Sequence, residues 1–144
     1  MRKHLLLLVM TIGYAWQAHA QAAPFQLVGF SSRNFRGDAG VRGMTRGCQD
    51  DFGAAARMCT STEVLQTVVW PQADVSPAWL QPVIVSGSTG TDASGINASP
   101  PRLSCVGWSQ VGTTGLTVDS QGSFRASDCN NARRVACCAP VPLP

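Results

Sequence analysis

Histidine, lysine and tyrosine are missing from most of this sequence. They occur only at His4, His19, Lys3 and Tyr14, and the rest of the chain beyond residue 20 has none. Their absence from that part excludes Ser-His and Cys-His nucleophile pairs, a lysine Schiff base and an imidazole metal site.

What remains for catalysis is a pair of carboxylates. The sequence offers Asp50 with Asp51, or Glu63 with an aspartate, and two carboxylates are sufficient for glycoside hydrolysis. Residues that are neighbours in a helix do not face each other, which favours solvated surface charges. We therefore expect no catalytic residue, and a carboxylate-dependent hydrolase is an alternative.

Long apolar runs are also scarce. The first one follows Arg2 and Lys3, reads "LLLLVMTIGYAW" and leads to "AHA", which is the pattern of a secretory leader cleaved after Ala20. This run is too short to span a bilayer comfortably, and no later segment approaches the roughly 20 residues that a spanning helix needs. The sequence predicts an exported protein, secreted or periplasmic, with no transmembrane segment and one domain over residues 21–144.

Charge gives no strong hint of a partner. Removing Arg2 and Lys3 from the 11 basic residues leaves nine arginines against eight acidic residues, a net charge of +1. Neither nucleic acid nor an anionic membrane is favoured by such a balance.

Six cysteines lie beyond the leader, and export makes disulfides the default over metal ligation. Six cysteines allow 15 pairings. A bond between the neighbours Cys137 and Cys138 would close a strained eight-membered ring, so both must reach elsewhere. On a strand they point to opposite faces.

The pattern of apolar residues indicates an α+β domain. Thr60 and Glu63 have the spacing of a capping box, and Val64, Leu65 and Val68 make an apolar stripe on a helix that Pro71 ends. A Gly- and Ser-rich surface loop covers residues 86–101. We expect helices within 44–58 and 60–70, and strands or strand-like segments at 25–30, 78–85, 103–109, 115–118 and 133–139.

Several segments resemble the endostatin-type domains, which share the C-type-lectin-like architecture. "GDAGVRGMTRGCQ" is similar to the entry into the first helix of that family, and "STEVLQTVVWPQADVSPAW" is similar to the second helix and its exit. "LSCVGWS" and "DCNNARRVAC" look like its two C-terminal cysteine segments, including the eight-residue step from Cys129 to Cys137. The resemblance covers most of residues 25–139 and implies two helices on a mainly antiparallel sheet.

The same resemblance implies a disulfide pairing. Carried over residue by residue, it joins Cys48 to Cys137 and Cys105 to Cys129, which leaves Cys59 with Cys138 as a third pair. The calcium ligands of C-type lectins are not carried over, because "QPV" at 81–83 and "GWSQ" at 107–110 lack the acidic oxygens that Ca²⁺ requires. The zinc-binding histidines of endostatin are missing too, so we expect no metal and no cofactor.

The candidate binding residues are aromatic and basic. Trp79 and Trp108 could stack on a sugar, although a Trp beside a strand cysteine is more often core. An anionic glycan could be bound by the four arginines of the approach to the first helix, Arg33, Arg36, Arg42 and Arg46.

Two short motifs carry less weight. Arg36-Gly37-Asp38 matches an integrin-recognition tripeptide, but it lies in a Gly-rich turn and is interpreted as structural. Asn97-Ala98-Ser99 has the N-glycosylation pattern, which matters only in a host that glycosylates exported proteins.

The sequence therefore predicts a calcium-independent, non-enzymatic recognition domain. Its partner would be a glycan, a matrix component or an extracellular protein, contacted through residues 86–101 and neighbouring turns. A structural subunit of a secreted or surface assembly is the first alternative.

Overall fold

The part of the chain that the structure describes has two three-stranded sheets, and its C-terminal strand is the middle strand of the first one. The computed structural model describes residues 23–72, 77–83 and 103–141. In this part, β6 (Ala136–Pro140) pairs antiparallel with β1 (Phe25–Phe30) on one side and with β2 (Arg57–Met58) on the other. The register of β1 on β6 shifts between Leu27 and Gly29, which marks a bulge.

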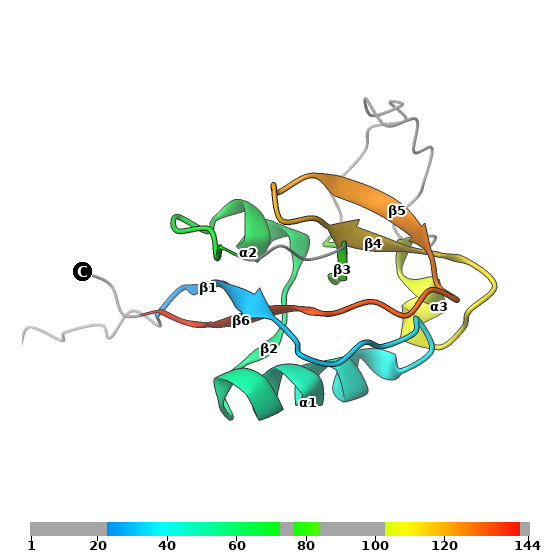
Figure 1. Ribbon diagram of the computed structural model, residues 1–144, viewed down its shortest axis with the longest axis horizontal. Coiled ribbons are helices and arrows are strands. Elements are labelled where there is room, and N and C mark those ends of the chain that lie inside the picture. The colour runs from blue at the N-terminus through cyan, green and yellow to red at the C-terminus, as the bar shows by residue number, and fades with distance from the viewer. Residues whose placement is uncertain (1–22, 73–76, 84–102, 142–144) are drawn as a thin grey trace, which may run out of the picture.

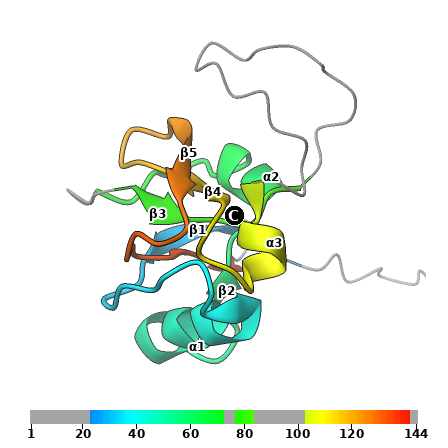
Figure 2. The same ribbon diagram turned by 90° about the vertical axis from the view of Figure 1, so that its right-hand side faces the viewer.

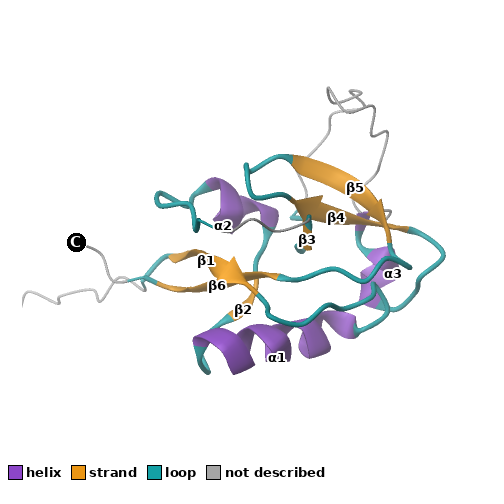
Figure 3. Ribbon diagram, viewed as in Figure 1, coloured by secondary structure: helices purple, strands orange, loops and turns teal. Residues whose placement is uncertain are grey.

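A second antiparallel sheet holds β3 (Ala78–Trp79), β4 (Thr114–Val118) and β5 (Phe124–Asp128), in that order. The first sheet lies between this sheet and the long helix α1 (Gly40–Phe52), as Figures 1 and 2 show. Two short helices complete the described part, α2 (Ser61–Leu65) and α3 (Cys105–Trp108) (Figure 3). The chain is thus a small α+β protein, with three helices in these residues where the sequence predicts two.

Three disulfides connect these elements, in the pairing that the resemblance implies. We name them the helix bridge (Cys48–Cys137), the connection bridge (Cys59–Cys138) and the loop bridge (Cys105–Cys129). Cys137 packs in one apolar cluster with Met44 of α1, and Cys138 packs in another with Val64 of α2. The two adjacent cysteines therefore point to opposite faces of β6, as the sequence predicts.

The prediction for the first helix is right in type but wrong in its bounds. α1 begins at Gly40 rather than near residue 44 and ends at Phe52. It ends there because Gly53 takes φ of 90°, a conformation that residues with a side chain rarely adopt.

The second helix is shorter than predicted. Its capping box is confirmed, because the Thr60 hydroxyl accepts from the Glu63 N–H and the Glu63 carboxylate accepts from the Thr60 N–H. The helix nevertheless stops at Leu65, well before Pro71. Val64 is buried, whereas Leu65 and Val68 are exposed, so the predicted apolar stripe is wrong.

The segment 103–109 is a helical turn and not the predicted strand. In α3, the φ angles of Cys105, Val106, Gly107 and Trp108 are 49°, 53°, 68° and 63°, which makes the turn left-handed. Ser104 holds it, since its carbonyl accepts from the Trp108 N–H and its hydroxyl accepts from the Gly107 N–H.

The other strand predictions are confirmed in part. β1 covers 25–30 as predicted, β4 covers 115–118, and β6 overlaps 133–139. Of the segment 78–85, only Ala78–Trp79 forms a strand, and residues 84–85 lie outside the described residues. The sequence does not predict β5. Only one residue of "FRASD" is buried, and the other four are exposed or half-buried. The loop 86–101, with Asn97-Ala98-Ser99, also lies outside the described residues.

Candidate functional site

Two of the four candidate arginines are engaged in ion pairs. The guanidinium of Arg33 lies 2.9 Å from the carboxylate of Asp50, and that of Arg36 lies 3.3 Å from the carboxylate of Asp38. Both pairs are exposed to solvent, where an ion pair contributes little to stability. These two arginines are therefore partly neutralised by neighbours.

Arg42 and Arg46 differ from the other two. Both are exposed on α1, and four residues of helix place them one turn apart on the same face, with Cβ atoms about 5–6 Å apart. No carboxylate of the described residues pairs with either of them. We call these two residues the arginine face.

The charges of α1 are arranged against its dipole. No acidic residue lies in its first turn, no side chain caps Ala39 at the N-terminus, and no basic residue lies in its last turn. Arg42 lies close to the positive N-terminal end, while Asp50 and Asp51 lie at the negative C-terminal end. Each of these placements costs the helix a few tenths of a kcal/mol or more, so helix stability does not explain Arg42.

The carboxylates that the sequence offers for catalysis have structural contacts. Asp51 accepts hydrogen bonds from the backbone N–H of Ser32 at 2.6 Å and from its hydroxyl at 2.9 Å. These bonds lower the pKa of Asp51, first through the backbone N–H and then through the hydroxyl. Glu63 accepts from the guanidinium of Arg57 as well as from the capping N–H of α2. Asp50, Asp51 and Glu63 thus hold loops and helix ends in place.

The predicted use of Trp79 and Trp108 for sugar stacking is wrong for this structure. Their side chains are 0% and 2% exposed, and their rings meet edge to face with centroids 5.5 Å apart. The Trp79 indole N–H donates to the Phe35 carbonyl at 2.7 Å. Both rings fill the core beside the loop bridge, where a ligand does not reach them.

The Arg36-Gly37-Asp38 tripeptide is explained by packing at its centre. Gly37 is buried, and a Cβ atom there would lie 2.4 Å from the Cys105 sulfur and 2.6 Å from the Cys129 Cβ. Its N–H also donates to the Cys129 carbonyl. The glycine is needed because the chain runs directly against the loop bridge.

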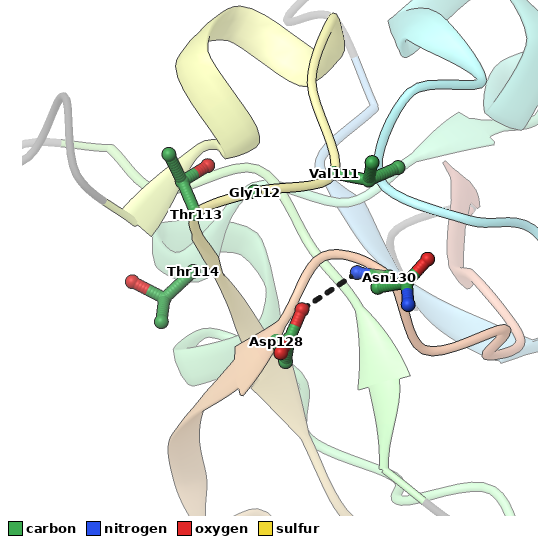
Figure 4. A pocket seen from close by; sticks show the side chains of 6 residues that line it. All are labelled: Val111, Gly112, Thr113, Thr114, Asp128 and Asn130. Atoms are coloured by element: carbon green, nitrogen blue, oxygen red, sulfur yellow. Dashed lines mark hydrogen bonds between the residues drawn. The ribbon is translucent and has the colours of Figure 1, made fainter.

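A shallow hollow of about 430 Å³ opens at the end of β5. Figure 4 shows it between the turn before β4 and the turn after β5, where the Asp128 carboxylate accepts from the Asn130 N–H at 2.8 Å. Its lining residues are Val111, Gly112, Thr113, Thr114, Asp128 and Asn130. No sequence pattern predicts this hollow, because these are ordinary turn and strand-end residues.

No family model, curated protein or solved structure matches this chain.

Neither a metal-ion site nor a membrane-spanning helix is found in the part of the chain that the structure describes. No group of three or more His, Cys, Asp or Glu side chains is arranged there to hold a metal ion. Among the same residues, no helix has the length and apolar character needed to cross a membrane.

Proposed function

We propose that this protein is an exported recognition domain that binds an anionic ligand, such as an acidic glycan, through the arginine face. The observation that carries the proposal is that Arg42 and Arg46 lie one helical turn apart, exposed and without a carboxylate partner among the described residues. Two guanidinium groups at this spacing can each donate two parallel hydrogen bonds to sulfate or carboxylate groups of one polymer.

The helix dipole supports the same interpretation. The N-terminal end of a helix attracts anions, and the first turn of α1 has no acidic side chain that would occupy it. A charge placement that costs helix stability and gains no contact within the fold is typical of a functional position.

The proposal includes a C-type-lectin-like architecture and no enzymatic activity. The pairing of β1 with β6 and the bridge from α1 to β6 support that architecture. The structural contacts of Asp50, Asp51 and Glu63 support a binding function over a carboxylate-dependent hydrolase. The three disulfides are consistent with an oxidising compartment, such as the periplasm or the extracellular space.

The test compares a sulfated polymer with its uncharged parent. The oxidised protein should bind dextran sulfate, and unsulfated dextran should bind at least tenfold more weakly. Exposed charged contacts are each worth about 0.5–1 kcal/mol. Arg42→Gln and Arg46→Gln should therefore each weaken binding about two- to fivefold, and the double variant about tenfold.

The matched control is Arg125→Gln. Arg125 has a side chain that is 67% exposed and only a distant partner, with 3.8 Å between its nitrogen and the Asp119 carboxylate. This variant removes the same charge from β5 in the second sheet and should leave binding within twofold of the wild type. Equal losses in Arg125→Gln and Arg42→Gln would show that net charge, and not the arginine face, attracts the polymer.

A further inference from the structure

Three aliphatic side chains stand out as the most exposed large apolar residues of the described part. Leu65, Val68 and Val69 are 70%, 82% and 78% exposed, whereas Val83 and Val106, the next in order, reach 43% and 46%. They follow one another across the end of α2 and the turn after it, and we call them the apolar tip. Burying such side chains elsewhere would be favourable, so their exposure requires an explanation.

Several hydrogen bonds connect the backbone around the apolar tip to the rest of the protein. The N–H groups of Gln66 and Thr67 donate to carbonyls of α2, and the N–H of Val68 donates to the side-chain oxygen of Gln26. The Thr67 hydroxyl accepts from the N–H of Leu27 in β1. These bonds fix the turn that presents the three aliphatic side chains to solvent.

The apolar tip also lies at the end of the molecule where the chain enters and leaves the fold. The turn after α2 projects beside the start of β1, next to the end of β6 (Figure 1). The N–H of Val141 donates to the carbonyl of Pro24 at this end. Residues 1–22 and 142–144 join the described fold at this end, beside the apolar tip.

Size and charge favour a lipid surface over a protein partner. Three aliphatic side chains fall well short of the about 800 Å² that each partner buries in a stable protein interface. Residues 61–72 contain one carboxylate, Glu63, and no basic residue, and the neighbouring Arg57 is neutralised by its ion pair with Glu63. Attraction at this site must therefore be apolar and independent of anionic headgroups.

We propose that the apolar tip inserts into the interfacial region of a lipid bilayer and holds the exported protein at the membrane surface. The mode is that of a monotopic anchor, in which a few apolar side chains enter the headgroup and acyl boundary. It is separate from the arginine face, which lies on α1.

The experiment measures partition of the oxidised protein, processed by its export machinery, into phosphatidylcholine vesicles. The wild type should co-float with vesicles, and Leu65→Ser/Val68→Ser/Val69→Ser should reduce the partition coefficient at least tenfold, because each aliphatic side chain contributes about tenfold when fully buried. Sodium chloride at 0.5 M should change partition by less than twofold, whereas it should strongly weaken binding to dextran sulfate.

Trp70 supplies a local readout. It is half-buried next to the apolar tip, while Trp79 and Trp108 lie in the core. Processing after Ala20 removes Trp16, so Trp70, Trp79 and Trp108 are the tryptophans of the assayed protein. Brominated phosphatidylcholine should quench the fluorescence of this protein, and further replacement of Trp70 by Phe should remove most of that quenching.

The matched control is Val83→Ser/Val106→Ser, which removes exposed apolar side chains elsewhere and should partition like the wild type. Melting temperatures should stay within a few degrees for both variants, since the replaced side chains are exposed. Failure of the wild type to co-float, or equal partition of the triple variant, would overturn the proposal. So would a lipid-free dimer that the triple variant abolishes, because the apolar tip would then be a protein interface.

Discussion

Removing either of the two bridges that end at Cys137 and Cys138 should cost less stability than the length of its loop suggests. The helix, connection and loop bridges span 89, 79 and 24 residues. Treated as isolated loops, they would stabilise the protein by about 4.6, 4.5 and 3.5 kcal/mol through the entropy of the unfolded chain. On that basis, removal of the loop bridge would cost least.

The adjacency of Cys137 and Cys138 reverses this order. With the helix bridge in place, Cys59 is connected to Cys138 through the eleven residues back to Cys48, the bridge itself and one further residue. The connection bridge then closes a loop of about 12 residues, which is worth about 2.8 kcal/mol. The same path applies to the helix bridge when the connection bridge is intact. The loop bridge has no such short cut and keeps its about 3.5 kcal/mol.

The assay is equilibrium urea unfolding of three variants, each with one pair of cysteines changed to alanine. We expect the loop-bridge variant to lose the most stability, and the helix-bridge and connection-bridge variants to lose similar, smaller amounts. All six sulfurs are fully buried, so the cavity left behind adds a comparable cost to every variant. Losses that increase with sequence separation would refute the shared-loop reasoning.

Three other substitutions test single contacts. Gly37→Ala should destabilise the fold by about 1–3 kcal/mol or more, because the added Cβ atom would clash with the loop bridge. Gly112→Ala is the control, since a Cβ atom there would have no neighbour within 4 Å, and thermal melts compare the two variants. Asp51→Asn should be less stable than the wild type at neutral pH. The hydrogen bonds from Ser32 lower the pKa of Asp51 in the folded protein. The stability difference is therefore complete above the unfolded pKa of about 3.9 and is lost as the pH falls through the folded pKa. Thermal melts across pH 2–7 measure it. Thr60→Ala should cost about 1 kcal/mol by urea unfolding, since it removes the cap of α2.

Local patterns in the sequence were sufficient for some elements. The capping box of Thr60 and Glu63 is a short-range signal whose partners lie three residues apart, and the structure has it. The β-branched and aromatic residues at 25–30 likewise predict β1. The disulfide pairing came from the resemblance, since the residues alone left several pairings open.

Other features depend on contacts that local patterns do not contain. α2 stops at Leu65 while Thr67 and Val68 bond to β1, about 40 residues earlier in the chain. The left-handed turn of α3 contains Val106, a β-branched residue that disfavours such a backbone. From the sequence, Arg42 and Arg46 are two of four equivalent candidates. The structure distinguishes them, because it shows that the other two arginines form ion pairs with Asp50 and Asp38.

Under the export that we propose, the central position of β6 constrains how the protein matures. Neither β1 nor β2 has a partner in the first sheet until residues 136–140 arrive, so a chain that crosses a membrane N-terminus first keeps this sheet unformed until nearly all of it has been translocated. Cys48 and Cys59 emerge long before their partners, and an oxidase that joins cysteines in order of appearance would link them to each other. We therefore expect maturation to require a disulfide isomerase that breaks this wrong bond, over the seconds to hours that disulfide exchange takes.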